Sequence, residues 1–209
     1  MLPVSAPLHG PLGVLSRLAW GAFAALALAG SLQWLPGQAR LAGLDPSAEV
    51  CVVAPPTPYE PASGLALLAP RPVPADARCP VCGMYPARSR DWAAQVIFDN
   101  GDTQFFDSPL TLMLYLQDVG RYSRGRSAEQ IAARYVTDAN SGAWLAAEAA
   151  VYVHGSNASG PMRAGNLPAF GDAAAAQRFA EQRGGRLLTL AQIDAGLLKG
   201  LGAQGKHRH

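Results

Sequence analysis

Hydrophobic and polar positions divide the 209 residues of this chain into stretches with very different patterns. Residues 18–35 carry no charge, whereas residues 37–78 are rich in proline and show no sustained helical or strand period. Regular patterns begin at about residue 79 and end at about residue 200, before a short tail at 201–209 that we expect to be flexible. We therefore expect one folded domain at 79–200, preceded by a proline-rich linker that favours extended, polyproline-like conformations.

The first half of the predicted domain, residues 79–140, has the pattern of a ββαβ unit. Two apolar runs, 93–98 and 103–106, flank a turn of Asp, Asn and Gly residues, which is typical of a β-hairpin. Asp107-Ser108-Pro109 then supplies a helix cap with proline at the first helical position, and an apolar helical run follows it. A short strand is expected at 135–138.

The second half, residues 141–200, repeats this order. The expected elements are strands at 149–154, 167–170 and 186–190, a helix at 173–182 capped by Asp172, and a terminal helix at 191–198. Aligning Phe106-Asp107-Ser108 with Phe170-Gly171-Asp172 places the two strand-to-helix junctions in register, which indicates an internal duplication. The predicted fold class is therefore α+β, with two related small ββα(β) units packed as one domain.

The uncharged N-terminal run follows Arg17 and ends at Pro36-Gly37, as expected of an export signal within residues 1–36. Ala27-Leu28-Ala29 before Gly30 resembles a signal-peptide cleavage site. The full run is also long enough to cross a bilayer as an uncleaved anchor, since about 18 residues is near the lower limit for a membrane helix. Either interpretation leaves the rest of the chain in the periplasm of a Gram-negative cell, free or anchored to the inner membrane.

Composition and motifs exclude several classes of function. The formal net charge is only +2 and the basic residues are scattered singly, so the chain is not expected to bind nucleic acid. It has no nucleophile elbow and no glycine-rich phosphate loop, and we expect it not to be an enzyme. Three cysteines cannot all pair within one exported chain, which favours chemistry over a disulfide framework. Cys51 lies in the linker and is interpreted as a spare thiol, with a third metal ligand or an intermolecular disulfide as alternatives.

The segment Cys79-Pro80-Val81-Cys82-Gly83-Met84 concentrates sulfur where the backbone is restricted. Pro80 fixes a backbone angle between the thiols and Gly83 removes bulk beside Met84, so three sulfurs can converge on one small volume. Thiolates and a thioether favour Cu(I) over hard, oxygen-seeking ions. A closed zinc site, a redox-active pair and a structural disulfide are the alternatives. The first lacks a second ligand pair, and Gly83 and Pro86 interrupt the helix that the second requires.

Residues far along the chain could complete this site. Met162 lies in the Gly160-Pro161-Met162 loop, where its side chain has no predicted core to join, and His154 ends the strand just before that loop. Both are candidate ligands, beside Cys79, Cys82 and Met84. Met113 lies among leucines in a helical run, where core packing explains it. Three nearby arginines could favour the thiolate forms that bind metal: Arg78, Arg88 and Arg90.

Several further motifs occur in a fixed order along the chain. They are CPVCGM at 79–84, DWAAQVIF at 91–98, FFDSP at 105–109, VTD at 136–138, VYVHGS at 151–156 followed by GPM at 160–162, and the closing GGRLLTL. Together they make the chain resemble the NosL family, the nitrous oxide reductase accessory proteins of denitrification, over about residues 79–198. The family's members are exported copper chaperones.

The resemblance implies Cu(I) binding, hand-off to an apparatus that builds the copper centres of nitrous oxide reductase, and a fold of two related ββα-type units. It also implies that the metal is held by the cysteine segment, Met84 and Met162. Two features depart from the family pattern. Family members are commonly lipoproteins, and a His often follows the GPM motif, whereas here residues 163–166 contain none.

Three functional hypotheses follow. The leading one is a periplasmic, non-enzymatic metallochaperone that binds one Cu(I) through Cys79 and/or Cys82, with Met84 or Met162 completing the site. Its partner would be a copper-receiving exported protein or the machinery that assembles it. The second is a periplasmic thiol-disulfide protein that acts on metalloprotein cysteines. The third is a scaffold whose cysteines form a structural disulfide.

Overall fold

The structure is a computed structural model that describes residues 54–162 and 166–204. These residues belong to one compact unit of the chain. The predicted signal or anchor segment, Cys51 and the end of the chain lie outside the described residues. Within the described ranges, no helix combines the length and the hydrophobicity that a membrane span requires.

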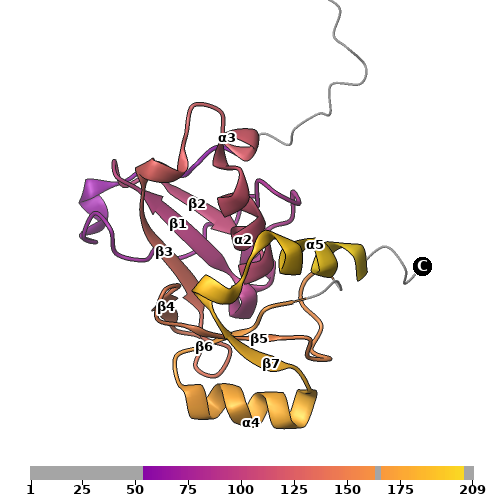
Figure 1. The fold of residues 1–209 in the computed structure, drawn as a ribbon. Helices are drawn as coiled ribbons and strands as arrows, with labels where there is room; N and C mark the ends of the chain where they lie inside the picture. Colours follow the sequence, from indigo (N-terminus) through magenta and orange to yellow (C-terminus); the bar gives the residue numbers. More distant parts are fainter. Residues whose placement is uncertain (1–53, 163–165, 205–209) are drawn as a thin grey trace, which may run out of the picture. The chain divides into compact units, whose positions relative to one another are not determined.

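The first half of the domain is built on a four-stranded antiparallel sheet with the order β2-β1-β3-β4 (Figure 1). Its strands are β1 (Ala94–Phe98), β2 (Thr103–Phe106), β3 (Ile131–Thr137) and β4 (Trp144–Ala146). Helix α2 (Pro109–Gln117) follows β2 and packs on β1 and β2, and a single helical turn, α3 (Val119–Tyr122), continues it. The central strand β1 pairs Ala94 with Phe106 on one side and with Val136 on the other.

The second half is a smaller antiparallel sheet with the order β6-β5-β7. Its strands are β5 (Val151–His154), β6 (Ala169–Phe170) and β7 (Arg186–Thr189), and helix α4 (Ala173–Arg183) packs against all three (Figure 1). The terminal helix α5 (Ala195–Gln204) leaves this half and packs on α2 of the first half. Short 3-10 helices fill the connections: η1 (Pro61–Ser63), η2 (Pro86–Arg88), η3 (Arg90–Trp92), η4 (Ala128–Gln130) and η5 (Leu190–Gln192).

Both predicted ββαβ halves are present, and the mixed α+β fold with two antiparallel sheets is confirmed. The predicted strand at 135–138 is the end of the longer strand β3, and β4 was not predicted because it has only three residues. The terminal helix begins four residues later than expected and extends to Gln204. It continues past residue 198 because Leu198 and Leu201 both bury their side chains.

Apart from strand β4, the two halves share one topology. In each, the first strand is central and pairs antiparallel with the second and third strands. Strand β2 ends at Phe106 and Ser108 caps α2, while β6 ends at Phe170 and Asp172 caps α4. The predicted alignment of the two strand-to-helix junctions therefore holds in the structure. This agreement supports an internal duplication.

The main hydrophobic core draws side chains from both halves. Phe98, Phe106 and Tyr115 come from the first half, and they belong to the same buried cluster as Tyr152 and Leu188 from the second. Because neither sheet buries this cluster alone, the halves form one domain rather than two. The opposite face of the first sheet buries a smaller cluster around Val73, Ala93 and Phe105.

The proline-rich segment differs from the extended linker expected at 37–78. Residues 54–78 lie along the first sheet, where Thr57 forms an antiparallel bridge with Thr103, the first residue of β2. Gln95 in β1 accepts a hydrogen bond from the Arg71 backbone N–H at 2.9 Å and donates one to the Arg71 carbonyl at 3.0 Å. All five residues of β1 are buried, so both faces of the sheet need a cover. The segment supplies the second cover, and this is why it is not free.

Candidate metal centre

The cysteine segment forms a closed turn. The Cys79 N–H donates to the Met84 carbonyl at 2.9 Å, and the Gly83 N–H donates to the Cys79 carbonyl at 2.8 Å. Gly83 has a φ of 72°, in the left-handed region that favours glycine. Only a short 3-10 helix, η2, follows the turn. The helix N-terminus that activates a thiol in oxidoreductases is therefore not formed here.

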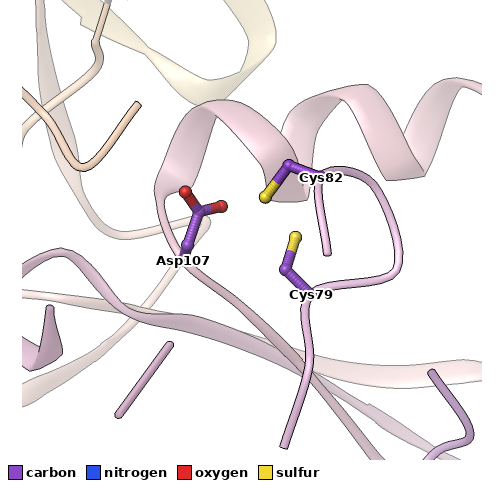
Figure 2. Close-up of side chains that lie close together, drawn as sticks. All are labelled: Cys79, Cys82 and Asp107. Atoms are coloured by element: carbon purple, nitrogen blue, oxygen red, sulfur yellow. The ribbon is translucent and has the colours of Figure 1, made fainter. Parts of the chain in front are cut away.

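The turn brings Cys79 and Cys82 together, and both are free thiols. Figure 2 shows their sulfur atoms directed toward each other and toward the carboxylate of Asp107. The two Sγ atoms and a carboxylate oxygen of Asp107 all lie within 4.8 Å of one another. Cys79 is 0 % exposed and Asp107 1 % exposed, whereas Cys82 is half-buried. The three ligand atoms lie close enough to hold one metal ion, reached from the Cys82 side.

Asp107 is the site residue that the sequence did not reveal. It was interpreted as part of the helix cap, but the side chain that caps α2 belongs to Ser108, which accepts from the Thr111 N–H. The Asp107 Oδ1 accepts a hydrogen bond from the Thr111 Oγ1 at 2.6 Å, while Oδ2 is buried without a partner. The only signal in the sequence is redundancy, since an acid directly before a Ser-Pro cap is not needed for capping.

Within the cluster, the pKa values of the two thiols are shifted in opposite directions. Burial alone would raise the pKa of the Cys79 thiol, but hydrogen bonds from the Cys82 thiol and from nearby backbone N–H groups leave it below its ordinary value. The hydrogen bond that Cys82 donates to Cys79 raises the pKa of Cys82, and burial and the negative charges of Cys79 and Asp107 raise it further. The first proton is thus lost readily and the second is held.

The two candidate methionines lie at the surface. The side chains of Met84 and Met162 are 37 % and 46 % exposed, and they are two of the four large hydrophobic side chains left exposed among the described residues. Met84 is tied to the cysteine turn through its carbonyl. Met162 lies in the loop between β5 and β6, far along the chain from Cys79. An exposed thioether can reach a metal only at the edge of a site.

His154 lies at the end of β5, opposite Arg186 in β7. Partial burial lowers its pKa below the ordinary value, and the positive charge of Arg186 lowers it further. The cluster of potential ligand atoms found among the described residues contains Cys79, Cys82 and Asp107, and does not include His154. His154 remains a prediction as a ligand.

The arginines beside the turn have another partner than the thiols. The guanidinium groups of Arg78 and Arg88 lie over the Tyr85 ring, at 4.4 and 4.7 Å from its centroid, and Arg78 also donates to the Tyr85 hydroxyl. The groups that shift the thiol pKa values are the two cysteines, Asp107 and backbone N–H groups. The arginines therefore form a cationic, aromatic surface next to the exposed Met84.

A family model described as NosL matches residues 70–198. No curated protein matches the sequence. Among solved structures, the crystal structure of the copper chaperone NosL from Shewanella denitrificans has a TM-score of 0.52 and 21 % sequence identity, covering 61 % of this chain and 97 % of that chain. This likeness shows the fold. The family match begins at residue 70, so it includes part of the segment docked on the first sheet.

Proposed function

The chain belongs to the NosL family, and from this premise we propose that it is a periplasmic, non-enzymatic Cu(I) chaperone. It would deliver copper for the assembly of nitrous oxide reductase or a related exported copper enzyme. The observation that carries the proposal is the pair of free thiols, Cys79 and Cys82, held together by a closed turn. The similarity to a crystallised copper chaperone supports the same interpretation.

The donor atoms suit Cu(I). Two thiolates are soft ligands, and Cu(I) accepts few of them, so the pair can hold the ion without a complete protein shell. Cys79 is fixed in the core and Cys82 is half-buried, while Met84 projects at the surface beside them. Met84 or Met162 would supply a third, exchangeable sulfur at the edge of the site.

This arrangement supports transfer by ligand exchange. A sulfur of the partner would replace the thioether first and Cys82 next, leaving Cys79 as the last ligand to be released. Cu(I) keeps its oxidation state throughout. Each thiol that becomes a ligand gives up one proton, and each thiolate released takes one back. The partner is a copper-receiving exported protein or its assembly machinery, and the N-terminal segment would export the chain and could anchor it to the inner membrane.

Competition for Cu(I) against a chromophoric chelator tests the site in the reduced full-length chain. We expect Cys79→Ser and Cys82→Ser each to lower Cu(I) affinity by at least about tenfold, because each removes one of two thiolates. Met84→Leu and Met162→Leu should have smaller effects, and His154→Gln identifies any part played by the imidazole. Undiminished affinity in both cysteine variants would refute the proposed site.

The thiol pair also suits a second function, a periplasmic thiol-disulfide protein acting on metalloprotein cysteines. The observation in its favour is the hydrogen bond between the thiols, with the pKa of Cys79 lowered. Such a protein would turn over disulfide substrates without metal, and its two methionines would not matter. A measured potential in the range of exchange catalysts, together with turnover, would favour this function over the chaperone.

A further inference from the structure

The Asp107 carboxylate is buried, but one of its oxygen atoms has no hydrogen-bond partner. Asp107 is 1 % exposed, its unpartnered oxygen is Oδ2, and one of its carboxylate oxygens lies within 4.8 Å of both sulfur atoms. Leaving a buried polar atom unpaired costs free energy, and the cost is greater for a charged group. A cation bound by the carboxylate and the two thiols would offset that cost. The carboxylate therefore adds a third donor to the pair that Cu(I) requires.

Charge and hardness indicate which cation fits the three donors best. Two thiolates and one carboxylate together carry three negative charges, so a divalent ion leaves less uncompensated charge in the core than Cu(I) does. Carboxylate oxygen is a poor partner for Cu(I) but an ordinary one for borderline ions such as Zn²⁺, which thiolates also bind. Cys79, Cys82 and Asp107 give Zn²⁺ three protein ligands and leave its fourth position open.

We propose that this cluster has a second binding mode, in which Cys79, Cys82 and Asp107 hold one Zn²⁺ ion. Asp107 sets the choice between the divalent ion and Cu(I), because only the divalent ion uses the carboxylate. The part of this inference that concerns Cu(I) rests on the proposed function, whereas the Zn²⁺ site does not. Both ions use the same thiols, so binding of one excludes the other.

The test uses the reduced full-length chain, with Co²⁺ as the spectroscopic probe and Zn²⁺ measured by competition with a chelator. The wild-type chain should bind one Co²⁺ with a thiolate charge-transfer band and the intense d–d bands of a tetrahedral ion. Asp107→Asn should lower Zn²⁺ affinity by about tenfold or more and change Cu(I) affinity by less than about threefold. The Asn side-chain carbonyl can still accept the Thr111 hydroxyl, so α2 keeps this contact.

Asp138→Asn is the matched control. Asp138 is also buried, but its carboxylate accepts from the Asn140 N–H and the Ser141 hydroxyl in a turn outside the cluster. It should leave the affinities for both metals unchanged. The proposal is overturned if the wild-type chain binds neither Zn²⁺ nor Co²⁺, if Asp107→Asn leaves Zn²⁺ affinity unchanged, or if Zn²⁺ and Cu(I) affinities fall by the same factor.

X-ray absorption of the Zn²⁺-loaded wild-type chain gives a result that does not depend on any variant. Two sulfur atoms and at least one light atom in the first shell are expected, and a shell of sulfur alone would contradict the proposal. Failure of the wild-type chain to bind Cu(I) while it still binds Zn²⁺ would refute the proposed function and leave the Zn²⁺ site standing.

Discussion

At the scale of single residues, the cysteine turn depends on the left-handed backbone of Gly83. This residue has a φ of 72° and donates the hydrogen bond that closes the turn on Cys79. Gly64 has the same φ at the end of the 3-10 helix η1, and a Cβ atom there would meet nothing within 4 Å. A substituted residue at either position would therefore have to adopt left-handed backbone, but only Gly83 positions a thiol.

This pair separates backbone strain from metal binding. Gly83→Ala and Gly64→Ala should each lower the free energy of unfolding by about 1 kcal/mol, the cost of a left-handed non-glycine residue. Only Gly83→Ala should also weaken Cu(I) binding, because it disturbs the spacing of Cys79 and Cys82. Urea denaturation and Cu(I) competition measure the two quantities. Equal effects of both variants on affinity would show that the turn does not position the thiols.

At the scale of elements, the segment at 54–78 is part of the folded domain. The Gln95 side-chain amide pairs with both the backbone N–H and the carbonyl of Arg71, as an adjacent strand would. The Arg71 side chain in turn donates to the carbonyls of Leu67 and Ala69 in the same segment. Tyr135 in β3 donates to the Leu68 carbonyl. With the bridge from Thr57 to Thr103 in β2, the segment is therefore anchored from three strands of the first sheet.

Removing the Gln95 amide should release this segment. Gln95→Leu leaves the buried N–H and carbonyl of Arg71 unpaired, and we expect a loss of about 2 kcal/mol in the free energy of unfolding. Limited proteolysis should then cut within residues 54–70. The matched control is Gln104→Leu. Gln104 is also buried, but its amide makes only one hydrogen bond, at 3.4 Å, to the Arg78 carbonyl. A larger loss in the control than in Gln95→Leu would contradict this account of the docking.

At the scale of the whole domain, the duplicated halves are not equivalent in chemistry. The position that holds Asp107 in the first half is Gly171 in the second, and a Cβ atom there would lie 3.0 Å from the Leu145 Cδ2 atom. The second half therefore contributes packing rather than a second site of this kind. Its terminal helix α5 packs on α2, the helix that begins directly after Asp107 and Ser108.

Because the core is shared, the described domain should unfold in one step. Near-ultraviolet and far-ultraviolet circular dichroism should give coincident urea transitions. Leu198→Ala should shift both together, with a loss of about 2–5 kcal/mol for a buried leucine that leaves a cavity. Two separated transitions, or a shift seen by only one probe, would show that the halves fold independently.

The sequence by itself determined the features that depend on neighbouring residues. The turn between β1 and β2, where Gly101 has a φ of 85°, was predicted. So were the caps at Asp107-Ser108-Pro109 and Asp172, and the order of the main strands and helices apart from β4 and α3. These signals are local, because a turn or a cap is satisfied within a few residues. The proximity of the Cys79 and Cys82 thiols is also a local feature, because only two residues separate them.

Only the tertiary structure decided which distant groups meet. Asp107 is 25 residues or more from the cysteines, and it reaches them because β2 ends beside the cysteine turn. Residues 54–78 have no hydrophobic periodicity of their own. They lie where they do because they cover a face of the first sheet that would otherwise be exposed to solvent. His154 is positioned by its pairing with Arg186. Such contacts depend on how the sheets are covered and paired, a property that no short stretch of sequence contains.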